Sequence, residues 1–226
     1  GGGLSSSAAF EVAVGLAAAA VAGWDVAPAE LARAAQRAEL VATGVPCGIQ
    51  DQMASVVGGV VLLDCRDLSA RPVAIPSGVR LLVVDSAVPR TLAGSPWSSR
   101  RAASFEAAAA LGVERLRDAS RLDSAADPLA RHVVDEIERV WRFADALDQG
   151  DVETAGRLMV ESHGSSRDLW RSSTAELDSL VETLVDAGAF GARLTGGGFG
   201  GCVVALVPGG AGDRIGASVA AEHHRR

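Results

Sequence analysis

A run of small residues at the start of the chain has the composition of an anion-binding loop. Gly1, Gly2 and Gly3 lead through Leu4 into three serines, and an alanine-rich apolar stretch follows. The first N–H groups of a helix have no partners within the helix and lie at the positive end of its dipole. A glycine turn feeding such a helix can hold a phosphate, and serine hydroxyls can donate to phosphate oxygens or ligate Mg²⁺. Taken alone, the same composition also fits a flexible linker.

Two carboxylates stand on either side of a glycine-bearing loop at residues 44–48. Asp51 follows the loop where a helix is expected to open, so it is either the N-cap of that helix or a base that takes the proton of a substrate hydroxyl. Glu39 precedes the loop on another expected helix. It is either a solvated helix charge or a second ligand for Mg²⁺, which prefers carboxylates and phosphate oxygens.

A second glycine-rich segment occupies residues 196–201, where five of the six residues are glycine. Apolar stretches flank it on both sides, which predicts two strands joined by a turn. Glycine weakens a strand, so this density indicates either a tight hairpin or a place where backbones approach closely.

Composition excludes several classes of function. The 226 residues carry a net charge of −7, which argues against nucleic-acid binding, and no apolar run is long enough for a membrane span. The chain has no lysine, so a Walker-type loop and Schiff-base chemistry are both excluded. Cys47, Cys65 and Cys202 are an odd number and far apart, which predicts reduced thiols in a cytoplasmic protein. The first residue is not Met, which indicates a processed, trimmed or partial chain.

The order of expected elements predicts an α+β protein. A domain boundary is expected near residue 76, where proline, serine and glycine precede a buried-strand pattern. Helices are expected at residues 5–21, 28–42, from 51, 99–111, 128–149, 152–162, 175–187 and from 211. Strands are expected at residues 59–64, 71–75, 80–84, 191–195 and 202–207.

Taken together, three segments resemble the GHMP small-molecule kinases, and within them the galactokinases. They are Gly-Leu-Ser-Ser-Ser-Ala at 3–8, Cys-Gly-Ile-x-Asp-Gln at 47–52 and Thr-Gly-Gly-Gly-Phe-Gly-Gly-Cys at 195–202. Further similar segments lie at 85–92, 100–101, 130–133 and 161–168, so the resemblance runs to about residue 208. It implies a GHMP kinase fold, with residues 1–76 as a partial N-terminal, ATP-binding domain and residues 77–226 as a helix-rich C-terminal domain.

The resemblance also implies an activity and the residues that perform it. The activity is transfer of the γ-phosphoryl group of Mg-ATP to the anomeric hydroxyl of galactose. Asp51 matches the catalytic base, while Ser7 and Glu39 match the Mg²⁺ ligands. The phosphate loop matches Gly1, Gly2, Gly3, Leu4, Ser5, Ser6 and Ser7, and the sugar contacts match Gly48, Asp51 and Trp97.

Several residues depart from the family pattern. The family's first motif lies upstream of the phosphate loop, and this sequence begins after it. Trp97 stands where the family has a sugar-contacting Tyr, and Leu40 and Gln50 stand where His and Met are usual. We therefore expect the 226-residue chain alone not to phosphorylate galactose, and turnover with Mg-ATP would contradict this.

Three alternatives stay open. Trp97 and Gln50 favour a GHMP kinase for another small sugar. A non-catalytic sensor of sugar and ATP is a second possibility, although Ser7, Glu39 and Asp51 are all retained. A purely structural fragment is the third. No nucleic-acid or membrane partner is expected, and a monomer is the expectation for the oligomeric state.

Overall fold

The computed structural model describes residues 4–44, 47–88 and 96–223. The chain divides into two compact units, Gly1–Ala74 and Ile75–Arg226, and each is described by itself. Among the described residues, no helix is long and apolar enough to cross a membrane.

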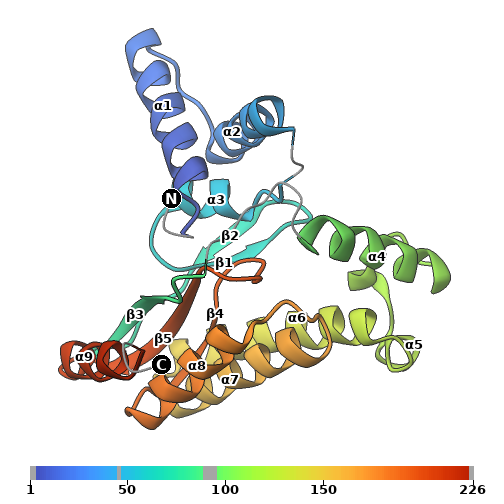
Figure 1. The fold of residues 1–226 in the computed structure, drawn as a ribbon. Coiled ribbons are helices and arrows are strands. Elements are labelled where there is room, and N and C mark those ends of the chain that lie inside the picture. Colours follow the sequence, from blue (N-terminus) through green and yellow to red (C-terminus); the bar gives the residue numbers. More distant parts are fainter. Residues whose placement is uncertain (1–3, 45–46, 89–95, 224–226) are drawn as a thin grey trace. The chain divides into compact units, whose positions relative to one another are not determined.

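The described residues of unit 1 form three helices and a hairpin (Figure 1). Its elements are α1 (Ser6–Ala22), α2 (Pro28–Thr43), α3 (Gln50–Val57), β1 (Val61–Asp64) and β2 (Ser69–Pro72). Pro28 sits in the first turn of α2, where its missing N–H costs nothing, and α1 and α2 both end on a glycine with positive φ, Gly23 and Gly44. These caps set the lengths of the two helices that carry Ser7 and Glu39.

Helices α1 and α2 approach closely where α1 has a glycine. A Cβ on Gly15 would lie 2.6 Å from Cδ1 of Leu31, so only glycine fits there without displacing that side chain. Val12, Leu31 and Ala35 form the buried contact between the helices. Other apolar side chains in this part of the chain are exposed, including Phe10 at 71% and Val21 at 91%.

The second strand of the unit 1 hairpin begins and ends earlier than the sequence-based expectation. The second strand is Ser69–Pro72 and not residues 71–75, because Asp64 pairs directly with Ser69. The Asp64 side chain accepts the backbone N–H of Arg66, and its carbonyl accepts that of Leu68. This closes the turn within four residues, so the chain returns to the strand conformation earlier than its apolar pattern suggests.

Unit 2 combines a three-stranded antiparallel sheet with helices. The strands β3 (Val79–Asp85), β5 (Cys202–Pro208) and β4 (Gly191–Leu194) lie in that order across the sheet. The helices are α4 (Pro96–Ala110), α5 (Arg121–Ser124), α6 (Pro128–Asp148), α7 (Val152–Asp168), α8 (Ala175–Asp186) and α9 (Gly212–His223), with a 3₁₀ turn at Leu116–Asp118. Helices α6 and α7 run side by side (Figure 1).

Alternation along the strands gives the sheet two faces. One face packs against α8 and α9 in the main core, which includes Leu82, Val203, Val207, Leu184 and Ile215. The other face carries Leu81 and Val204 towards α6 and α7. On this side α7 meets β4 backbone to backbone, since a Cβ on Gly156 would lie 2.0 Å from the carbonyl oxygen of Phe190.

The helices of unit 2 agree with the expected ones to within three residues at their ends, except at two places. Helix α7 continues to Asp168, six residues past the expected end. The residues of that added stretch include buried Ser165 and Ser166, whose polar character hides the helical pattern from a sequence reading. The 3₁₀ turn and α5 were not expected, because three- and four-residue elements carry too little periodicity to be recognised.

A buried histidine links α7, α8 and β4. His163 is 3% exposed, and its Nδ1 accepts the backbone N–H of Leu194 at 3.3 Å. Burial lowers the pKa of His163, and because Nδ1 accepts this N–H, it is Nε2–H that donates to Asp178 at 2.9 Å. The same Asp178 oxygen accepts the hydroxyl of Ser173 at 2.5 Å. This network holds the end of β4, directly before the glycine-rich turn.

His132 predicts a pH dependence of stability. It stacks on Trp170 with ring centroids 5.1 Å apart, and its Nδ1 lies 2.8 Å from the Ser165 hydroxyl. Burial, aided by the charges of Arg193 and Arg139, lowers the pKa of His132 to about 4. Below about pH 6.5 the unfolded chain therefore binds a proton at His132, whereas the folded chain does not bind it until the pH nears 4. Stability is expected to fall by up to about 3 kcal/mol as the pH drops from 6.5 to 4, and not to depend on this group above that range.

Urea unfolding at several pH values tests this. The variant His132→Asn keeps a polar atom near Nδ1 but does not titrate in this range, so wild type should lose more stability than the variant as the pH falls. A constant difference between the two proteins from pH 7 to pH 4 would refute the assignment.

Candidate functional site

Helix α1 begins within the predicted phosphate loop. Gly1, Gly2 and Gly3 lie outside the described residues, whereas Leu4 to Ser7 are described. Ser5 has a left-handed backbone (φ 54°), and α1 begins at Ser6 with no side-chain cap and no acidic residue in its first turn. The leading N–H groups of a 17-residue helix are thus left without a side-chain cap, which is the local requirement for binding an anion.

The two residues predicted to ligate Mg²⁺ are brought together from different helices. The Ser7 hydroxyl on α1 donates to Oε1 of Glu39 on α2 at 2.8 Å. Glu39 is 7% exposed, so it is not the solvated helix charge that was the alternative. A hydroxyl and a carboxylate side by side are hard oxygen donors of the kind that Mg²⁺ uses, with water and phosphate oxygens completing its shell. Among the described residues no three His, Cys, Asp or Glu side chains gather into a metal cluster.

Gln52 was not singled out by sequence reasoning, yet it completes the surroundings of Glu39. It is wholly buried, and its Nε2 donates to Oε2 of Glu39 at 2.6 Å. The signal that could have identified it is its place as the last residue of the Cys-Gly-Ile-x-Asp-Gln segment, to which no role was assigned. A second glutamine, Gln36, donates to the carbonyl of Cys47 at 3.0 Å and holds the loop before α3.

The centre of unit 1 is electrostatically negative. Burial, reinforced by the nearby charge of Glu39, raises the pKa of Glu11, while a hydrogen bond from Gln52 lowers it. Burial and Glu39 also raise the pKa of the Cys47 thiol to about 11, so this cysteine is protonated and is not a nucleophile near neutral pH. Such surroundings favour the arrival of a cation next to Ser7 and Glu39.

Asp51 lies in the first turn of α3 and is exposed. The residue at the N-cap position is Ile49, so Asp51 does not have the capping role that was the alternative. Asp51 is exposed one residue before the completely buried Gln52. Gly48 is also exposed, with open space where a Cβ would be. Trp97 is half-buried in the first turn of α4, in unit 2.

Both readings of the second glycine segment apply, since it is a hairpin turn with close backbone approaches. Four of its glycines have positive φ, and so does Phe199 at 61°. Phe199 donates its N–H to the carbonyl of Ser172 at 2.6 Å, and Gly201 donates to that of Val88 at 3.2 Å. A Cβ on Gly198 would lie 2.1 Å from the Ser172 carbonyl oxygen. The turn is therefore clamped between two backbone segments, which explains its glycine content.

Substituting Gly198 by alanine is expected to destabilise the protein. The φ of +75° alone costs about 1–3 kcal/mol for a residue with a side chain, and the contact with Ser172 adds to it. Gly164→Ala in α7 is the matched control. Nothing lies within 4 Å of its Cβ position, and in a helix alanine is more favourable than glycine by about 0.5–1 kcal/mol. Urea unfolding should show loss of stability in the first variant and none in the second; equal behaviour would contradict the clamp.

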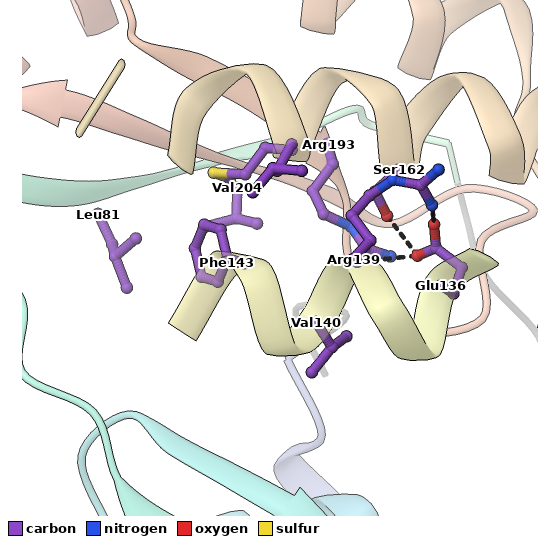
Figure 2. A pocket seen from close by; sticks show the side chains of 10 residues that line it. Leu81, Glu136, Arg139, Val140, Phe143, Ser162, Arg193 and Val204 are labelled. Carbon is purple, nitrogen blue, oxygen red and sulfur yellow. Dashed lines mark hydrogen bonds and ion pairs between the residues drawn. The ribbon is translucent and has the colours of Figure 1, made fainter. Parts of the chain in front are cut away.

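A cavity of about 220 Å³ lies in unit 2, between α6, α7 and the sheet. Figure 2 shows Leu81, Phe143 and Val204 along its apolar side and Glu136 at its polar end. Glu136 accepts the Ser162 hydroxyl at 2.5 Å and pairs with Arg139 and, at 3.9 Å, with Arg193. None of the site residues predicted from the sequence lines this cavity.

Comparison with known proteins places both units in one class. Residues 1–59 match the family model of the GHMP kinases N-terminal domain, and residues 143–225 match that of the GHMP kinases C-terminal region. A mevalonate kinase from L. major has the same fold, with a TM-score of 0.74 and 24% identity over 96% of this chain and 61% of that one. The α+β architecture is thus that of the GHMP kinases.

Within this class, the chain is similar to galactokinases. It is 49% identical to the galactokinase of Chloroflexus aggregans over 225 residues, which are 92% of this chain and 58% of the relative. A galactokinase from Lactococcus lactis, solved in complex with galactose, has a TM-score of 0.91 and 31% identity over 99% of this chain and 63% of that one. The chain spans about 58–60% of the length of two curated galactokinases that it matches.

Proposed function

We propose that a protein which contains this chain and has the full length of its relatives is a galactokinase. Below it is called the full-length protein. It transfers the γ-phosphoryl group of ATP to the anomeric hydroxyl of galactose. The similarity to galactokinases supports the substrate pair, and the meeting of Ser7 with Glu39 at 2.8 Å carries the assignment of a metal-nucleotide site. The odd number and wide spacing of Cys47, Cys65 and Cys202 support a cytoplasmic location, and we propose a monomer that binds neither nucleic acid nor membrane.

The chain's own residues divide the work of the reaction. The N–H groups at the start of α1 hold phosphate oxygens, and Ser7 and Glu39 would hold Mg²⁺, which neutralises phosphate charge when bound. Asp51 orients the sugar hydroxyl and accepts its proton as the hydroxyl oxygen bonds to the γ-phosphorus and the bond to the departing ADP breaks. Positioning and electrostatics supply most of the rate in such transfers.

The test is phosphorylation by the full-length protein of a panel of sugars at fixed Mg-ATP. Galactose should give the highest kcat/KM. A higher value for another sugar would favour a different GHMP sugar kinase, which the half-buried Trp97 would then help to specify. Binding of galactose and ATP without turnover would replace the proposal by a sensor.

A further inference from the structure

Gln52 contacts the proposed metal ligand from the side opposite to Ser7. Glu39 uses one carboxylate oxygen, Oε1, for the Ser7 hydroxyl and the other, Oε2, for the Gln52 amide. The terminal torsion of a glutamate is broad, so a carboxylate held at one oxygen can turn. A carboxylate held at both oxygens cannot turn in this way, so Oε1 of Glu39 stays next to Ser7. The Gln52 bond is buried and has a charged acceptor, which makes it one of the stronger kinds.

The side chain of Gln52 also joins the elements around the site. It starts from α3, reaches Glu39 on α2, and its Nε2 lies 3.8 Å from Sγ of Cys47 in the intervening loop. One amide therefore connects α3 with α2 and with the loop between them.

Two buried oxygens beside this amide have no hydrogen-bond partner among the described residues. They are Oε1 of Gln52 and Oε2 of Glu11. Buried acceptors in native proteins are nearly always satisfied, so a wholly buried glutamine with an idle oxygen is not explained by core packing alone. The presence of the buried Gln52 amide is better explained by the hydrogen bond that its Nε2 donates to Glu39.

The neighbour of Gln52 in sequence is the proposed base. Asp51 is exposed whereas Gln52 is completely buried, so anchoring Gln52 fixes the backbone from which Asp51 projects. No side chain caps the start of α3, which leaves the buried amide as a principal polar anchor of this turn.

We propose that Gln52 is a positioning residue that holds the Glu39 carboxylate towards Ser7 and fixes the first turn of α3, so that metal ligands and base keep one geometry. The inference rests on the proposed function. Partners of this kind around a metal ligand typically change metal affinity or activity by about 10–100-fold when they are removed.

The test compares Gln52→Met with Gln36→Met in the full-length protein. Methionine keeps the length of glutamine and removes its amide, and the Gln36 amide bonds the carbonyl of Cys47 in the same loop, whereas the Gln52 amide bonds Glu39. Mn²⁺ affinity, measured by electron paramagnetic resonance in the presence of ADP, should fall about 10–100-fold in Gln52→Met and stay near the wild-type value in Gln36→Met. In turnover, KM for Mg-ATP should rise while KM for galactose changes little.

A double-mutant cycle separates positioning from general damage. If Gln52 acts through Glu39, Gln52→Met should cost no further Mn²⁺ affinity once Glu39→Gln is present. Equal losses in Gln52→Met and Gln36→Met, or full additivity with Glu39→Gln, would overturn the inference. If thermal unfolding shows that Gln52→Met does not fold, Gln52→Asn replaces it, since the shorter amide cannot reach Glu39. A wild-type protein without turnover refutes the proposed function, whereas an active wild type with an unaffected Gln52 variant refutes only this inference.

Discussion

Replacing Asp51 by asparagine in the full-length protein is expected to lower kcat for galactose phosphorylation by about 10²–10⁴-fold, the usual contribution of a general base. Asparagine keeps the size of the side chain but cannot accept the proton of the sugar hydroxyl. Asp51 is exposed and does not cap α3, so folding should be little affected. The favourable position of a carboxylate in a first helical turn contributes only about 0.3–1 kcal/mol.

Steady-state kinetics with Asp25→Asn as control measures this effect. Asp25 is an exposed aspartate of the same unit, in the connection between α1 and α2, and its substitution removes the same charge. KM for Mg-ATP should change little in either variant. If Asp51→Asn retained the wild-type kcat, Asp51 would not be the base.

Replacing Glu39 by glutamine is expected to lower the affinity for the metal at least about 10–100-fold. Removing a residue that only supports a metal ligand already costs this much, and Glu39 is itself a proposed ligand. Glutamine has nearly the same shape, but it removes the negative charge from the pair formed with Ser7. Folding should survive, because the substitution also removes repulsion from Glu11, whose pKa is raised by burial and then by Glu39. The concentration of Mg²⁺ that gives half-maximal activity should rise accordingly.

The matched control is Glu30→Gln, an exposed glutamate in the first turn of the same helix. Mn²⁺ titration with ADP gives a readout that does not depend on turnover. An unchanged Mn²⁺ affinity in Glu39→Gln, or the same loss in Glu30→Gln, would remove Glu39 from the metal site.

Local signals account for most of the secondary structure predicted from the sequence. Pro28 and Gly44 delimit α2, and the pattern around residues 196–201 predicts the antiparallel pair β4 and β5. The errors fall where local signals are weak or where side chains override them. The β2 register depends on Asp64 closing a short turn, and α7 extends through polar residues that become buried.

The sequence by itself determined which groups are present for chemistry. They are a glycine-serine loop before a helix, two carboxylates flanking a second loop, and a glycine segment between strands. Residue types and spacing carry that information, and they carry the family resemblance. Only the tertiary structure decided which of these groups meet. Ser7 and Glu39 are 32 residues apart in the chain and touch because Gly15 lets α1 pack on α2. Gln52 showed its importance only when burial placed its amide on Glu39, since long-range contacts of this kind leave no periodic trace in the sequence.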